Sequence, residues 1–255
     1  MTKNQQSLTL LLIVLTISFF PLFLHLDTLS IRMFDEAFYA NSAYEMTLNG
    51  NFLVKHFNGQ PDMYNLKPPL GTWIHALSFK LVGIDELALR LPSALSGLLL
   101  VIFFWYVFDR KFHNPILAVA SSLMLVTSTG WVTGHVSRTG DLDALLVFCL
   151  MLSAWHFYLF IEKDQGKNLL IAGLWTIAAV LVKGVAGLFW LPAFLLYALF
   201  KKKLLETLKN KFFYVCLVLF VILVGGYYLA RELALPGYLE KVLKYEIFGR
   251  YTHPQ

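Results

Sequence analysis

Long apolar runs recur along the chain, each close to the length that crosses a lipid bilayer. A membrane-spanning helix needs about 20 consecutive apolar residues, because it rises only about 1.5 Å per residue. The runs occupy residues 8–26, 92–108, 115–130, 144–161, 169–182, 185–200 and 212–230. The pattern predicts an all-α integral membrane protein with about seven transmembrane helices.

The first run has two interpretations. An apolar stretch at an N-terminus can be a cleaved signal peptide, but this one is long for that role, and no small-x-small cleavage site follows it before Leu29. We therefore expect a retained helix.

The segment 27–91, between the first two runs, has a different pattern. Apolar residues recur at helical spacing over 36–48 and again over 70–81, and Asn49-Gly50 supplies a stop for the first of these helices. The two prolines after Lys67 bias that residue away from helix. We expect two short helices lying at the membrane interface, with Lys67 on a stiff extended stretch between them.

Composition and charge agree with this topology. Hydrophobic residues make up 58% of the chain and charged residues only 15%, which is more apolar surface than one globular core can bury. Basic residues are dense in the short loops between alternate runs, whereas most carboxylates fall on the other side. Because Lys and Arg of short loops stay in the cytoplasm, the segment 27–91 is predicted to be extracytoplasmic.

Other features exclude several classes. The net charge of +5 reflects topology, since no basic stripe with interleaved aromatic residues suggests a nucleic acid partner. Cys149 and Cys216 lie inside apolar runs, where a thiol behaves as a small hydrophobe, so we expect neither a disulfide nor a metal framework. No repeat or linker marks a second domain, and we expect residues 1–255 to form one domain.

Charged residues gather at the predicted outer ends of the runs. Asp35 and Glu36 start the first interfacial helix, Asp141 and Asp143 precede the fourth run, and Lys183 breaks the apolar stretch between the fifth and sixth. An Asp at a helix start is often only a cap, and a lysine there can extend its ammonium to the interface. The alternative is a site where carboxylates abstract a proton or hold a metal and lysine binds an anion.

Two further pairs stand four residues apart, which places both members on one face of a helix. They are Glu86 with Arg90 and Glu246 with Arg250. The simplest interpretation is an ion pair within each helix, which stabilises it by a few tenths of a kcal/mol.

Several segments form an ordered set. They are Asp35-Glu36-Ala37-Phe38-Tyr39-Ala40, Gly50-Asn51-Phe52-Leu53-Val54, His56-Phe57-Asn58-Gly59, Lys67-Pro68-Pro69-Leu70, Trp73, Arg90-Leu91-Pro92-Ser93-Ala94, the stretch 138–146, Lys183-Gly184, and Glu246 with Gly249-Arg250-Tyr251. In order and spacing, over nearly the whole chain, the set resembles the membrane glycosyltransferases that include the protein O-mannosyltransferases and the bacterial aminoarabinose transferases acting on lipid A.

This resemblance implies an activity and roles for residues. A sugar would move from a polyprenyl-phosphate donor to a protein, lipid or glycan acceptor at the outer face of the membrane, with inversion at the anomeric carbon. Asp35 stands at the position of the family's catalytic aspartate and would be the base. Asp143 or Asp141 would orient hydroxyl groups, and Asp143 matches the family's second aspartate more closely.

The resemblance also implies substrate contacts. The leaving group is a lipid phosphate, and fixed cations stabilise its developing charge. Lys67, Lys183 and Arg250 would supply these cations. The same comparison makes the following residues substrate-binding candidates: Glu36, Tyr39, Arg138 and Glu246.

Two positions depart from the aminoarabinose branch. Leu66 stands where that branch usually has Glu, and Phe38 stands where an Arg often follows the Asp-Glu pair. The first change removes an expected metal ligand, which argues against a required divalent metal. Both changes argue against aminoarabinose and favour a hexose or a related lipid-linked sugar.

Family members usually run to about twice this length, so we expect an N-terminal part of the fold, incomplete at its C-terminus, in a bacterial plasma membrane. Two other classes compete. A non-catalytic membrane scaffold of the same fold is favoured by the short chain. A secondary transporter would show inverted repeats and charges near the midplane, neither of which the sequence displays.

Overall fold

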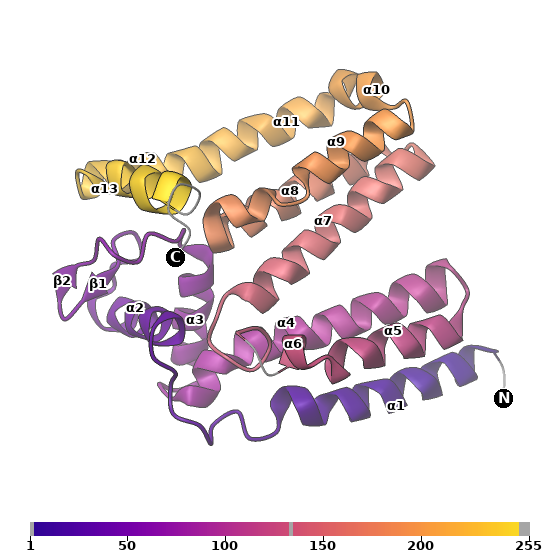
Figure 1. Cartoon of the computed structure of the whole chain (residues 1–255), viewed down its shortest axis with the longest axis horizontal. Coiled ribbons are helices and arrows are strands. Elements are labelled where there is room, and N and C mark those ends of the chain that lie inside the picture. Colours follow the sequence, from indigo (N-terminus) through magenta and orange to yellow (C-terminus); the bar gives the residue numbers. More distant parts are fainter. Residues whose placement is uncertain (1–2, 133–134, 250–255) are drawn as a thin grey trace. The chain divides into compact units, whose positions relative to one another are not determined.

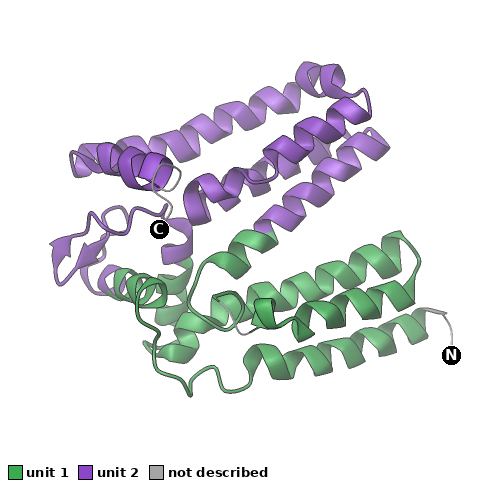
Figure 2. Ribbon diagram, viewed as in Figure 1, with its two compact units in different colours: residues 1–44, 74–148 green, residues 45–73, 149–255 purple. Residues whose placement is uncertain are grey.

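The computed structural model describes residues 3–132 and 135–249, which form helices and one short hairpin (Figure 1). The chain divides into two compact units (Figure 2). Unit 1 comprises residues 1–44 and 74–148, and unit 2 comprises residues 45–73 and 149–255. Three helices, α2 (Asp35–Asn49), α3 (Leu70–Val82) and α7 (Asp143–Lys163), have residues in both units. The single domain expected from the sequence stays a prediction.

Unit 1 is built around three long helical segments. These are α1 (Lys3–Phe23), α4 (Glu86–Trp105) with its π-helical continuation η1 (Tyr106–Lys111), and α5 (Pro115–Thr127), which the short α6 (Thr129–Val132) follows. Their shared core consists of Val14, Leu22, Val101, Trp105, Ala118 and Val126. At one end, the Ser7 hydroxyl donates to the Asp109 carboxylate at 2.6 Å, which satisfies two buried polar groups.

Unit 2 contains the rest of α7 and the C-terminal helices. In chain order these are α8 (Gly166–Lys183), η2 (Gly184–Leu188), α9 (Leu191–Phe200), α10 (Leu204–Lys209), α11 (Lys211–Phe220), η3 (Val221–Gly225), α12 (Gly226–Ala234), α13 (Tyr238–Lys241) and η4 (Val242–Phe248). The unit also holds an antiparallel hairpin, β1 (His56–Phe57) and β2 (Gln60–Pro61), in which His56 pairs with Pro61. This hairpin precedes the extended stretch that carries Lys67.

Five helices are long and apolar enough to cross a membrane: Asn4–Phe23, Glu86–Lys111, Asp143–Lys163, Gly166–Leu188 and Lys211–Ala234. The other two predicted runs form shorter apolar helices, Pro115–Thr127 and Leu191–Phe200. The all-α, multi-pass membrane architecture is therefore confirmed. The predicted break at Lys183-Gly184 is confirmed, because α8 ends at Lys183, Gly184 takes a φ of +63°, and the chain continues as a 3₁₀ turn to Leu188.

The two short helices predicted between the first runs are present as α2 and α3. Gly50 has a φ of +69° and its N–H donates to the Met46 carbonyl at 3.1 Å, so the Asn49-Gly50 stop acts as the sequence predicted. On α3, Trp73, Leu77 and Leu81 are exposed along one face. Their position at the membrane interface stays a prediction.

Gly187→Ala is expected to destabilise unit 2 by about 1–3 kcal/mol. An added Cβ would lie 2.6 Å from Val180 Cα and closer still to its backbone nitrogen, and backbone cannot move aside as a side chain can. The measurement is the midpoint of thermal unfolding in detergent. Gly225→Ala is the matched control, because a Cβ there meets nothing within 4 Å. Equal midpoints for the two variants would contradict the prediction.

Candidate functional site

The first charged cluster lies in unit 1 and centres on a buried ion pair. Arg90 Nε donates to Glu36 Oε1 at 2.8 Å and Nη2 donates to Oε2 at 3.2 Å. The Arg90 side chain also donates to the backbone carbonyls of Leu26, Leu29 and Ser30 at 2.6–3.0 Å. This Glu36–Arg90 clamp therefore ties the start of α2 to α4 and to the chain that follows α1.

The Glu36 carboxylate accepts two further bonds from backbone N–H groups. Arg32 donates to Oε2 at 2.7 Å and Gly140 donates to Oε1 at 2.8 Å. Burial raises the pKa of Glu36, but the hydrogen bonds from Arg90, Arg32 and Gly140 outweigh burial and hold the pKa below its ordinary value. Glu36 is thus a charged, saturated acceptor that fixes local structure, while its predicted substrate contact stays untested.

The clamp corrects one expectation from the sequence. Arg90 was expected to pair with Glu86 on the same helix, but its guanidinium binds Glu36, 54 residues away. A buried arginine gains more from a bidentate carboxylate and three carbonyls than from one exposed helical pair.

Asp35 and Asp141 belong to the same cluster. Asp35 is exposed at the first residue of α2, next to the clamped Glu36. Asp141 is buried, and its Oδ2 accepts from the Thr139 hydroxyl at 2.8 Å and lies 3.1 Å from His135 Nδ1. Burial raises the pKa of Asp141, and the negative charge of Asp35 raises it further. The structure therefore places these two carboxylates within electrostatic reach.

The other candidates of unit 1 have structural partners. Asp143 is half-buried at the first residue of α7. Arg138 donates to the carbonyls of Pro21 and Leu24 at 2.6 and 2.7 Å, so its guanidinium satisfies the end of α1. Tyr39 is buried with its ring 6.5 Å from the ring of His75. Their predicted roles toward substrate stay predictions.

The second charged cluster lies in unit 2 and centres on Lys67. Its ammonium binds Glu246 Oε2 at 2.5 Å, and the two side chains are 11% and 23% exposed. Glu246 was expected to pair with Arg250, but in the described residues it binds Lys67; Arg250 itself lies outside them. These two charged residues, both part of the resemblance and 179 residues apart, thus contact each other directly.

The stretch that carries Lys67 is held by side chains that the sequence reasoning missed. Lys55 Nζ, which is buried, donates to Asn65 Oδ1 at 3.0 Å and to the Lys67 carbonyl at 2.7 Å. The buried Arg231 donates from Nη2 to the Asp62 carbonyl at 2.9 Å. Lys55 and Arg231 therefore hold the backbone of the stretch that carries Lys67.

The sequence contained a signal for two of these residues, Lys55 and Arg231. Lys55 stands between two matching segments, and Arg231 interrupts the end of an apolar run, as Lys183 does. Tyr238, whose hydroxyl donates to the Leu66 carbonyl at 2.9 Å and whose ring lies 4.8 Å from the Arg231 guanidinium carbon, offered no such signal.

Lys183 comes close to the same cluster through its neighbour. A Cβ added at Gly184 would lie 3.7 Å from Pro68 Cδ and 3.7 Å from the Tyr228 hydroxyl. The Lys183-Gly184 turn therefore packs against Pro68, the residue that follows Lys67, within unit 2. Binding of phosphate by Lys67 and Lys183 stays a prediction.

Lys55→Met is expected to remove a pH-dependent part of the stability. Burial, and then the charge of Arg231, lower the pKa of Lys55 from 10.5 to about 7. Between these values the unfolded chain binds more protons than the folded chain, so the wild type gains stability as pH rises, by up to about 1.4 kcal/mol per pH unit. Unfolding midpoints measured over this window should rise less in Lys55→Met. Lys202→Met, at an exposed lysine, should keep the full rise, and identical profiles for both variants would refute the effect.

Across residues 3–132 and 135–249, the structure shows no group of three or more His, Cys, Asp or Glu side chains that could hold a metal ion. Whether the reaction depends on a divalent metal stays a prediction from the sequence.

Helices long and apolar enough to cross a membrane, with clusters of charged residues near their ends, define a multi-pass membrane protein. The family model of dolichyl-phosphate-mannose-protein mannosyltransferases matches residues 66–228. The chain belongs to this family of membrane glycosyltransferases.

Individual proteins from several bacteria are also similar to this chain. An uncharacterized protein of Aquifex aeolicus is 30% identical over 83% of this chain and 41% of its own length. The putative mannosyltransferase YkcB of Bacillus subtilis is 31% identical over 63% of this chain and 22% of its length. The undecaprenyl phosphate-alpha-4-amino-4-deoxy-L-arabinose arabinosyl transferase of Pseudomonas savastanoi is 29% identical over 69% and 33%.

A solved structure shows the shared fold. The crystal structure of ArnT from Cupriavidus metallidurans bound to undecaprenyl phosphate matches with a TM-score of 0.79 at 21% identity, over 94% of this chain and 44% of that one. The chain spans less than half the length of these relatives.

Proposed function

We propose that this chain takes part in glycosyl transfer from a polyprenyl-phosphate sugar to a protein, lipid or glycan acceptor. The observation that carries the proposal is an exposed carboxylate, Asp35, on a helix start that the buried Glu36–Arg90 clamp holds in place. A base needs exposure to reach its substrate and a rigid mount to keep its orientation. Asp35 has both.

In this reaction Asp35 takes the proton from the acceptor hydroxyl or amine. The acceptor's electron pair forms a bond to the anomeric carbon as the bond from that carbon to the phosphate oxygen breaks, and the phosphate leaves with that electron pair. Attack opposite the leaving group inverts the anomeric carbon. Asp141 or Asp143 orients hydroxyl groups, and the low-dielectric surroundings of Asp141 suit a hydrogen-bonding role.

The leaving phosphate is bound by cations of unit 2. Lys67 and Lys183 supply them, and Arg250 is the third member that the family resemblance implies. Arg231, whose guanidinium donates to the Asp62 carbonyl, adds a buried cation to this unit, and fixed charge at a desolvated site stabilises developing negative charge.

The relatives support a lipid-phosphate donor. ArnT from Cupriavidus metallidurans, whose fold matches 94% of this chain, was crystallised with undecaprenyl phosphate. Leu66 and Phe38 favour a hexose over aminoarabinose. We place the reaction at the extracytoplasmic face of a bacterial plasma membrane, as the distribution of basic loops indicates.

The test supplies radiolabelled polyprenyl-phosphate sugars and membrane extract to the purified chain, and in parallel to any longer form that its genome encodes. Transfer from a hexose donor, and weaker transfer from aminoarabinose, is the expected result. If both forms are folded and neither transfers a sugar from a broad panel of donors, the enzyme hypothesis is rejected in favour of a non-catalytic scaffold or a transporter.

A further inference from the structure

Lys67 lies on a stretch, residues 62–67, that forms neither helix nor strand. No regular ladder of backbone hydrogen bonds fixes its position, and side chains from a distant part of unit 2 hold the backbone instead. The Tyr238 hydroxyl donates to the carbonyl of Leu66, one residue before the lysine, at 2.9 Å. Both Tyr238 and Leu66 are buried, so water does not compete for this bond, which is stronger than a bond at the surface would be.

Tyr238 is itself held firmly at the start of α13. Gly237, with a φ of +90°, turns the chain into this helix. The Glu232 carboxylate accepts from the N–H groups of Gly237 and Leu239, on either side of the tyrosine, at 2.9 and 2.7 Å. The tyrosine ring also lies 4.8 Å from the guanidinium carbon of Arg231. A hydroxyl on such a mount can hold a carbonyl in one place.

Arg231 holds the other end of the stretch. It is fully buried, and its Nη2 donates to the Asp62 carbonyl at 2.9 Å. Within the part of the chain that the structure describes, its Nε and Nη1 have no hydrogen-bond partner. A buried cation with one hydrogen bond stabilises a fold less than an apolar side chain of the same size would. What the arginine adds is a second fixed point on the backbone that leads to Lys67.

We propose that Tyr238 is a positioning residue, which, with Arg231 as the second anchor, keeps the Lys67 ammonium where it can bind the phosphate of a polyprenyl-phosphate. The inference rests on the proposed binding of that phosphate by Lys67. Neither anchor has to touch the ligand, because each acts on the backbone. A lysine ammonium is a point charge on a flexible stem, so a mobile backbone would have to be ordered on binding and the affinity would fall.

The test measures the dissociation constant (Kd) of undecaprenyl phosphate for the purified full chain, in the wild type, Tyr238→Phe, Lys67→Met and the double variant. Tyr238→Phe keeps the ring and removes only the hydroxyl, so its Kd should rise about fivefold, the loss of one hydrogen bond. Lys67→Met removes the ammonium and should weaken binding further. Because Tyr238 acts through Lys67, the double variant should bind as weakly as Lys67→Met alone.

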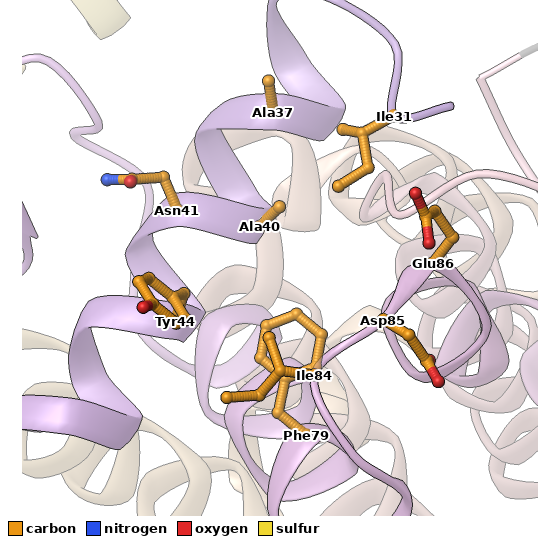
Figure 3. A pocket seen from close by; sticks show the side chains of 9 residues that line it. All are labelled: Ile31, Ala37, Ala40, Asn41, Tyr44, Phe79, Ile84, Asp85 and Glu86. Carbon is orange, nitrogen blue, oxygen red and sulfur yellow. The ribbon is translucent and has the colours of Figure 1, made fainter. Parts of the chain in front are cut away.

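Two more measurements separate positioning from general destabilisation. Amide hydrogen exchange needs no ligand, and peptides covering residues 62–67 should exchange faster in Tyr238→Phe. Arg231→Lys keeps the charge but changes the donor geometry, and it should also raise the Kd only when Lys67 is present. Tyr44→Phe is the matched control. Tyr44 is 41% exposed and lines an open hollow of about 370 Å³ in unit 1, so this variant should keep the wild-type Kd and exchange (Figure 3).

The outcomes are distinct. A folded Tyr238→Phe protein with the wild-type Kd or unchanged exchange, or a double variant that binds more weakly than Lys67→Met by the full factor, would overturn the positioning role. If Lys67→Met binds undecaprenyl phosphate as the wild type does, the proposed phosphate contact of Lys67 is wrong and the positioning role falls with it. Intact binding without any sugar transfer would reject the proposed glycosyl transfer alone.

Discussion

Asp35→Asn is expected to lower the rate of glycosyl transfer by about 10²–10⁴-fold, the range that a positioned general base supplies. Asparagine has nearly the same shape as aspartate but cannot accept a proton at neutral pH. The fold should persist, because Asp35 is exposed and the bonds that fix the start of α2 belong to Glu36. Loss of a charge in the first turn costs only about 0.3–1 kcal/mol.

The measurement compares initial rates of radiolabel transfer with a donor that the wild type accepts, alongside unfolding midpoints in detergent. The loss should appear in kcat, since the base acts in the transition state and not in donor binding. Asp27→Asn makes the same chemical change at another exposed carboxylate and should transfer at the wild-type rate. A folded Asp35→Asn protein that keeps more than a tenth of the rate would exclude Asp35 as the base.

Arg90→Ala is expected to destabilise the protein by about 3–5 kcal/mol, the cost of leaving one partner of a buried ion pair alone. Glu36, which is 1% exposed, would lose its charged partner, and the carbonyls of Leu26, Leu29 and Ser30 would lose a donor. Thermal and denaturant unfolding in detergent measure the loss. Arg138→Ala is the matched control. The Arg138 guanidinium also binds backbone carbonyls but is nearer to solvent, so this variant should lose less stability than Arg90→Ala.

The double variant Arg90→Ala, Glu36→Gln should recover part of this loss by removing the orphaned charge. Acid offers a second check. The pKa of Glu36 lies below its ordinary value, so the clamp contributes fully above that value and loses its contribution as pH falls through the lowered pKa. The gap in stability between wild type and Arg90→Ala should therefore narrow in acid. A gap that stays constant to pH values well below the ordinary pKa of Glu would contradict this account.

The helices could be predicted because they follow from local rules. Apolar runs long enough for a bilayer and 3.6-residue periodicity predicted α1, α4, α7, α8 and the segment from α11 to α12, as well as the short α2 and α3. The break at Lys183-Gly184 was predicted as well, because a charge followed by glycine interrupts an apolar helix. The 3₁₀ turn by which the chain then continues to Leu188 was not predicted.

The partners of the charged residues could not be predicted in the same way. The i,i+4 rule paired Arg90 with Glu86, because it considers only one helix, whereas in the fold Arg90 binds a carboxylate 54 residues away. Glu246 binds Lys67 across 179 residues, and its pairing with Arg250, which lies outside the described residues, stays a prediction. Such pairs depend on how helices pack, which no spacing rule contains, and Lys55 was missed for the same reason.

The ion pair of Lys67 with Glu246 gives unit 2 an internal competitor for any anion. A phosphate that binds the Lys67 ammonium has to displace the Glu246 carboxylate, which already lies 2.5 Å away. The affinity for phosphate is therefore lower than it would be for an unpaired lysine. The carboxylate of Glu246 gives the Lys67 ammonium a partner of opposite charge within unit 2. Binding of a phosphate to Lys67 would release the Glu246 carboxylate. The lysine would thus exchange one anionic partner for another.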